Sequence, residues 1–304
     1  MTLSTGASGS GRMRGLVAIN VTGVIFGTAA LFGKLPVSPL WIIGVRTLVA
    51  TLTMVVWGSL TRELAAIPRR HWPAIAGSAV VMSLSWVLFY STVQYGGVAV
   101  ATLTFSTFPL FALLVDSWHM KRRPRLVEIL ATGAIFAAVY LVVDPSRSSG
   151  TYWWVLAGLG SAMLYALYWH LGRSLRPALS ETMVTISQSA LIALTMLPLL
   201  PFVSRPPIHL AEWGWLVWFG AINTALASQL YLYALRHLSA SSCGAFVAME
   251  PVYAITFAAL IFREPISSRT LVSGVVILSA SYLLSRVEAD PAISPNGAPD
   301  GHEI

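Results

Sequence analysis

Two charged residues, Glu250 and Arg46, stand inside long apolar stretches and are the first candidates for chemistry. Glu250 lies near the middle of the run from 239 to 262, directly before Pro251, and Arg46 is the only basic residue well inside an apolar run. A buried carboxylate could bind an amine or carry a proton, and a guanidinium could hold a carboxylate through two parallel hydrogen bonds. Together the two residues would suit a zwitterionic ligand.

Both residues also have structural alternatives. Glu250 could bond backbone groups that Pro251 leaves unpaired, or a neighbouring hydroxyl. Arg46 could pair with Glu250 or Asp116 as a structural lock, or extend its long side chain toward the membrane surface. The sequence leaves these alternatives open.

Aromatic residues recur four positions apart on two other apolar runs. The pairs are Trp86 with Tyr90, and Tyr165 with Trp169. This spacing places each pair on one helix face. The rings could line a binding cavity, or they could pack between helices and anchor them at the membrane interface.

Polar and helix-breaking residues complete the candidate site. Gln229 and Tyr233 share one face of a further run, and Tyr253 lies in the run that also holds Pro251. Polar side chains in lipid face protein or water, so Gln229 could contact a ligand or join helices. Because proline donates no backbone hydrogen bond, Pro109 and Pro251 predict helix breaks that could serve gating.

The composition indicates the class of protein that positions these residues. Of the 304 residues, 56% are hydrophobic and 10% are charged, whereas a typical soluble domain has about 25% charged residues. The net charge is +7, but the arginines lie in short connections and form no basic face, which argues against nucleic-acid binding. The sequence therefore predicts an integral membrane protein.

Ten apolar runs are long enough to be membrane-spanning helices, since roughly 20 residues cross a core of about 30 Å. They cover residues 15–33, 40–60, 73–94, 98–120, 126–143, 152–171, 180–203, 213–235, 239–262 and 267–284. The tails, 1–14 and 287–304, contain too few apolar residues to fold alone and are predicted to be disordered. Because the connections are short, function must reside in the membrane.

The basic residues predict how the chain is oriented. With the N-terminus in the cytoplasm, 13 of the 19 basic residues fall on the cytoplasmic side and 5 on the other, with Arg46 inside a span. The positive-inside rule then places both termini in the cytoplasm of a bacterial-type inner membrane.

The two halves of the chain resemble each other at a nearly constant offset. The aligned residues are Lys34 with Arg173 at 139, Pro109 with Pro251 at 142, and Gly133 with Gly274 at 141. The segments 15–143 and 152–286 each contain five predicted spans, and an odd number inverts the second relative to the first. We therefore expect an all-α membrane protein of ten transmembrane helices, in two inverted-topology five-helix repeats around a central cavity.

Two longer sequence segments resemble segments of the ten-span EamA type of transporter in the drug/metabolite transporter superfamily. They are VATLTFSTFPLFALLVD with the following KRRP (100–124), and AFVAMEPVYAITFAALIFREP (245–265). The resemblance implies an inner-membrane transporter with a central cavity, and many such proteins export amino acids or related metabolites. The family often has an acidic residue after the fourth span, but this sequence carries Arg122 there. The family's acidic residue is therefore matched only in the second half, by Glu264.

These observations predict a secondary transporter that exports small metabolites by alternating access, with neutral or aromatic amino acids as the favoured substrates. A carrier of drugs or nucleotide-sugars is an alternative, although a bulky anion would need more cations than Arg46. An intramembrane enzyme acting on lipid-linked substrates, or a non-transporting receptor, lacks a supporting motif or extramembrane domain. We expect no cofactor and no metal, and leave open protons as a coupling ion and a monomer or homodimer.

Overall fold

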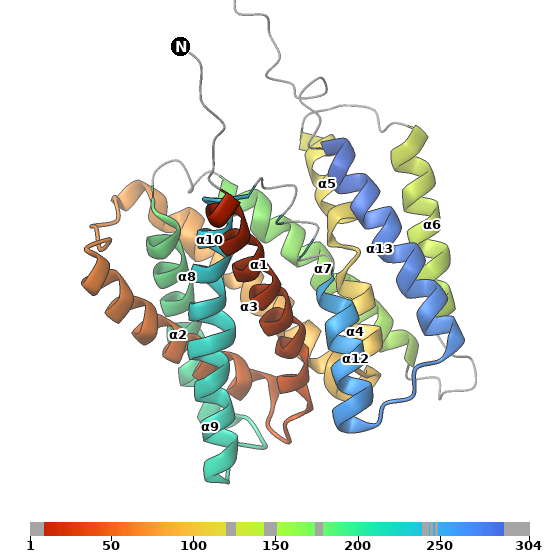
Figure 1. Cartoon of the computed structure of the whole chain (residues 1–304). Coiled ribbons are helices and arrows are strands. Elements are labelled where there is room, and N and C mark those ends of the chain that lie inside the picture. Colours follow the sequence, from red (N-terminus) through yellow and green to blue (C-terminus); the bar gives the residue numbers. More distant parts are fainter. Residues whose placement is uncertain are drawn as a thin grey trace, which may run out of the picture.

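The computed structural model describes residues 9–119, 126–142, 151–173, 179–238, 243, 246 and 249–288. Every regular element in this part of the chain is a helix. The helices form one bundle, in which α1 begins at one end and runs toward the other (Figure 1). We call the end where α1 begins the N-terminal face.

The described part of the first half contains eight helical segments, several of them short. They are α1 (Gly9–Ala29), η1 (Ala30–Lys34), α2 (Pro39–Thr61), η2 (Arg69–His71), α3 (Trp72–Gly96), α4 (Val98–Phe105), α5 (Phe108–His119) and α6 (Leu126–Val142). The described elements of the second half are α7 (Thr151–Arg173), α8 (Glu181–Met196), η3 (Leu197–Phe202), α9 (Leu210–Trp218), η4 (Phe219–Leu226), α10 (Ala227–Leu235), α12 (Glu250–Phe262) and α13 (Ser268–Glu288).

Helix lengths and surfaces fit a membrane environment. Within the described residues, six helical stretches are long and apolar enough to cross a membrane, and three shorter apolar stretches lie in α6, α12 and α13. Large apolar side chains such as Leu60 and Leu260 are 77% and 74% exposed. Exposed apolar side chains are favourable when they face lipid. The helical conformation also pairs the backbone groups within each segment, as lipid requires.

The tightest contact between the halves joins α3 to α7. Ser85 Oγ donates to the Ser161 carbonyl at 2.9 Å, and Ser161 Oγ donates to the Ser85 carbonyl at 2.8 Å. Gly158, which lies on α7 with Ser161, packs so closely on α4 that an added side chain would collide with Thr104. Small residues and paired hydroxyls are how helices associate in lipid, where apolar contact alone gives little preference.

A helix begins just before each of the two predicted prolines, with α5 starting at Phe108 and α12 at Glu250. The expected fourth span is divided into α4 and α5, and the break falls at Ser106 and Thr107, just before Pro109. Pro251 occupies the first turn of α12, which begins at Glu250. Proline fits there because the first helical N–H groups have no intrahelical partner. Gating by these breaks remains a prediction.

Candidate functional site

Arg46 is buried on α2 and held between aromatic rings. Its side chain is 6% exposed. The guanidinium carbon lies 3.6 Å from the ring centre of Trp86 and 4.5 Å from that of Phe219. Its Nη1 donates a hydrogen bond to the Tyr90 hydroxyl at 2.9 Å. Aromatic faces stabilise a cation, and more so where water is excluded.

In the described part of the chain, Arg46 has no carboxylate partner. Among the described residues the one ion pair is Lys34 with Glu264. The alternative in which Arg46 pairs with Glu250 is therefore not observed, and the side chain of Asp116 is not described. The Arg46 Nε is buried and has no hydrogen-bond partner in this part of the chain. Because an uncompensated charge is costly in the membrane interior, an anionic group would be stabilised beside this guanidinium.

A continuous wall of rings leads away from Arg46. Tyr90 contacts Phe89 with ring centres 5.2 Å apart, Phe89 contacts Phe105 at 5.2 Å, and Phe105 contacts Tyr165 at 4.8 Å. The wall therefore passes from α3 over α4 to α7. Such rings can stack on apolar or aromatic groups.

Tyr165 is the centre of the far part of this wall. Its ring lies 5.3 Å from Phe108, 5.7 Å from Tyr168 and 6.3 Å from Trp169. The Tyr168 hydroxyl donates to Gln188 Oε1 at 2.9 Å, which links the wall to α8. The predicted pair Tyr165 and Trp169 therefore joins the same cluster as Trp86 and Tyr90.

Glu250 lies near this wall, at the first residue of α12. The helix α12 packs against α4, whose last residue, Phe105, belongs to the wall. In the described part of the chain it makes no ion pair, and no hydrogen bond of its side chain is seen. The positive end of the α12 dipole favours a negative charge at this position. Arg46 and Glu250 thus border one aromatic region without pairing with each other.

Three predicted site residues lie elsewhere. Gln229 donates to the Met54 sulfur at 3.7 Å, between α10 and α2. Tyr233 is 37% exposed, and its ring lies 4.5 Å from that of His237. Tyr253 packs against α1 so closely that a side chain at Gly27 would collide with it. These contacts describe helix packing and show no approach to Arg46.

Phe219 was not among the sequence predictions, although it covers one face of Arg46. It begins the π-helix η4, which packs on α2 through Gly220, where a Cβ would lie 2.5 Å from the Arg46 carbonyl. One turn later, Asn223 Nδ2 donates to the Ile25 carbonyl at 2.6 Å. A π-helical turn shifts the residue register and is frequent at functional sites. A lone phenylalanine in an apolar run carries no signal of this shift.

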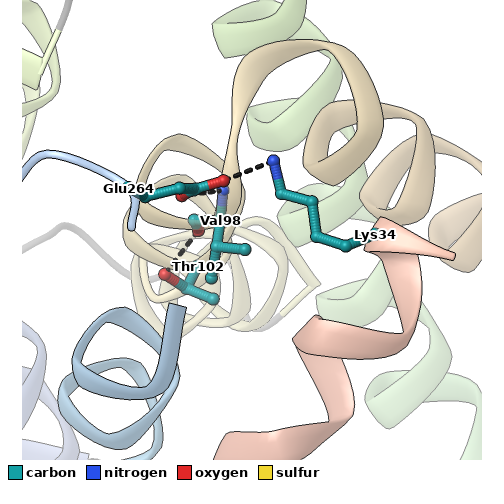
Figure 2. A network of polar contacts seen from close by, with 4 residues as sticks. All are labelled: Lys34, Val98, Thr102 and Glu264. Atoms are coloured by element: carbon teal, nitrogen blue, oxygen red, sulfur yellow. Dashed lines mark hydrogen bonds and ion pairs between the residues drawn. The ribbon is translucent and has the colours of Figure 1, made fainter. Parts of the chain in front are cut away.

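A second polar cluster lies at the opposite end of the bundle from the N-terminal face. We call this opposite end the Lys34 face. Figure 2 shows Glu264 between Lys34 and the start of α4. Glu264 forms an ion pair with Lys34, and its Oε2 accepts the Val98 N–H at 3.2 Å. Thr102 Oγ1 donates to the Val98 carbonyl at 2.8 Å. This cluster joins the two halves of the chain.

Further contacts of the Lys34 face lie beside this cluster. Gln94 Nε2 donates to the Val37 carbonyl at 2.7 Å. The Ser38 N–H donates to the Arg205 carbonyl at 3.1 Å, and Arg205 Nη2 donates to the Tyr95 hydroxyl. In the described part of the chain, no group of three or more His, Cys, Asp or Glu residues could hold a metal ion.

The helices, the repeat and the buried polar residues define a class, that of polytopic membrane transporters. Residues 13–144 and 152–286 each match the EamA-like transporter family, and the chain belongs to this family. The expected fold class is confirmed as an all-helical membrane protein with two EamA repeats. The protein is a secondary transporter, not an enzyme.

Similar proteins span nearly the whole chain. An uncharacterized transporter of Archaeoglobus fulgidus is 22% identical over 90% of this chain and 96% of its own length. The pseudopaline exporter CntI of Pseudomonas aeruginosa is 25% identical over 78% of this chain and 83% of its own. A solved crystal structure has a TM-score of 0.62 at 17% identity and covers 93% of this chain and 100% of that one. At this identity the structure supports the fold alone.

Proposed function

We propose that this transporter exports small zwitterionic metabolites, with neutral or aromatic amino acids as the favoured substrates. The observation that carries the proposal is the arrangement of Arg46 and Glu250, which border one aromatic region without forming an ion pair. A molecule that carries both a carboxylate and an ammonium group would compensate both charges. An uncharged or singly charged molecule would compensate one of them at most.

Each group of the substrate has a partner in this arrangement. Arg46, with the Tyr90 hydroxyl beside it, binds the carboxylate, because a guanidinium offers two parallel donors. Glu250 binds the ammonium group. The wall of Phe105 and Tyr165 packs against the apolar or aromatic side chain. Removing either charge leaves the other substrate group without its partner.

Alternating access then carries the substrate across the membrane, as in other inverted-repeat transporters whose sites lie near the midplane. The arginine distribution supports cytoplasmic termini in a bacterial-type inner membrane, and similarity to an exporter supports the outward direction. Glu250 is the candidate for proton coupling, because protonation would remove the charge that holds the ammonium group. A monomer or a homodimer would each be compatible with this scheme.

A carrier of nucleotide-sugars fits the charges less well. Several phosphate charges would need several cations, and among the described residues Arg46 is the only basic residue in the aromatic cluster. A drug without a carboxylate would leave that cation uncompensated. The zwitterion is therefore preferred.

Counterflow of radiolabelled amino acids into proteoliposomes tests the proposal. Wild type should accumulate a neutral or aromatic amino acid, and Arg46→Gln and Glu250→Gln should each lose this accumulation. Arg70→Gln, which removes an exposed cation, is the control and should transport like wild type. Folded wild-type protein that moves no amino acid in the panel, or two charge variants that transport normally, would contradict the proposal.

A further inference from the structure

The cluster at the Lys34 face connects segments that must separate if the cavity opens there. Lys34 ends η1 and Val98 begins α4, both in the first repeat, whereas Glu264 follows α12 in the second repeat. Figure 2 shows the Glu264 carboxylate reaching both the Lys34 side chain and the backbone of Val98. One side chain thus joins three segments from two repeats.

Two interactions at Glu264 reinforce each other. The first N–H groups of a helix lack intrahelical partners, and the helix dipole places partial positive charge there, so a carboxylate at the start of α4 is favourable. Lys34 adds a full positive charge beside the same carboxylate. Both side chains are 23% exposed, so water and salt compete with the pair. The contact can therefore break and re-form.

In the sequence, the two positions equivalent to this ion pair do not carry opposite charges. In the overlay of the two halves, Lys34 corresponds to Arg173 and Glu264 to Arg122. Arg122 lies outside the described residues, and the side chain of Arg173 is not described. At the level of sequence these are two positive charges, and two positive charges cannot form an ion pair.

We propose that Lys34, Glu264 and the Val98 N–H form a latch that closes the cavity at the Lys34 face and opens once in each transport cycle. Because the Lys34 face has this contact while the equivalent sequence positions carry no opposite charges, we expect the resting protein to open preferentially at the N-terminal face. This inference rests on the proposed alternating-access function. With the N-terminus in the cytoplasm, the latch keeps the unloaded site open to cytoplasmic substrate.

Reversible cross-linking tests whether the latch must open. Lys34→Cys and Glu264→Cys are combined in a Cys243→Ala background and bridged with a short bis-methanethiosulfonate. Cross-linking should reduce counterflow at least tenfold, and a reductant should restore it. For each single-cysteine variant, the same treatment should leave counterflow at that variant's own untreated rate. A cross-linked double variant that transports as fast as the reduced protein would overturn the proposal.

A second measurement needs no substrate. Spin labels at the exposed positions Pro36 and Ile266 report the separation of the Lys34 and Glu264 segments. The unmodified latch should give mainly the short distance. Lys34→Met should raise the long-distance population, and Glu264→Ala should raise it further, because it also removes the acceptor for Val98. Unchanged distances in both variants would overturn the latch.

Exchanging the charges separates the ion pair from the helix interaction. In Lys34→Glu combined with Glu264→Lys, the pair can form again, but a lysine now stands at the start of α4. The short-distance population should therefore recover only in part. If wild type moves no amino acid while the spin-label distances respond as expected, the proposed substrate fails and the latch stands. If substrate moves while the distances stay fixed, the latch fails alone.

Discussion

Lys34 and Arg46 are consecutive basic residues in the sequence of the first half, but the fold places them in different environments. Lys34 is paired with Glu264 at a partly exposed helix end, whereas Arg46 is buried between Trp86 and Phe219 without a carboxylate among the described residues. A satisfied pair at a bundle end can hold two repeats together. A cation that aromatic faces stabilise only in part remains available for an anion from outside. The contrast separates a closing contact from a binding contact.

Among variants that keep the charge or leave both charged residues in place, the largest effect is expected for Arg46→Lys. Lysine keeps the charge but loses the planar fork and the stacking on two rings. Losing a hydrogen bond to a charged group costs about 1.5–3 kcal/mol, so apparent substrate affinity should fall by about tenfold or more. Concentration-dependent counterflow measures this change. Equal affinity in the variant would show that charge alone matters and would weaken the contrast with Lys34.

Gly220→Ala should disturb the aromatic holder of Arg46 without touching its charge. The new Cβ would lie 2.5 Å from the Arg46 carbonyl and 2.6 Å from Val49 Cβ. Overpacking of this kind costs about 1–3 kcal/mol, so thermal unfolding in detergent should occur several degrees lower, with weaker transport. Gly214→Ala is the matched control, because nothing lies within 4 Å of its added Cβ. Equal melting temperatures would contradict the close packing of η4 on α2.

Removing the Lys34 charge should change stability less. A partly exposed ion pair contributes about 0–1 kcal/mol, so Lys34→Met should lower the melting temperature only slightly. Glu264→Ala should cost about 0.5–2 kcal/mol more, the range for losing a helix-capping side chain. Thermal unfolding of both variants compares the two contributions. Equal losses would mean that Glu264 acts through Lys34 alone.

The smallest effect is expected at Glu212, just outside the predicted eighth span. Its carboxylate accepts the N–H groups of His209 at 3.1 Å and Ile208 at 2.6 Å, and these hydrogen bonds hold the pKa of Glu212 below its usual value. Because the pKa of Glu212 is lower in the folded state than in the unfolded state, its ionised carboxylate stabilises the fold at pH values above the unfolded-state pKa. This stabilisation is lost as the pH falls through the folded-state pKa. Glu212→Gln should therefore melt slightly below wild type at neutral pH and like wild type in strong acid. A difference that persists in acid would contradict this account.

Much of the fold could be predicted because the membrane restricts what a chain can do. A run such as 40–60 must be helical, since lipid offers its backbone no other hydrogen-bond partner. The break before Pro109 and the helix start at Glu250 follow from the missing proline N–H. The aromatic pair Trp86 and Tyr90 could be assigned to one face because α-helical spacing is regular.

The sequence by itself determined the helices, the repeat and the chemical types in the site, because these depend on local spacing and on burial in lipid. The tertiary structure decided which helix faces meet. It brought Phe219 over Arg46 through a π-helical turn, placed Tyr253 against α1, and joined Lys34 to Glu264 across the two repeats. Helix rotation depends on packing between distant segments, which composition and periodicity do not contain.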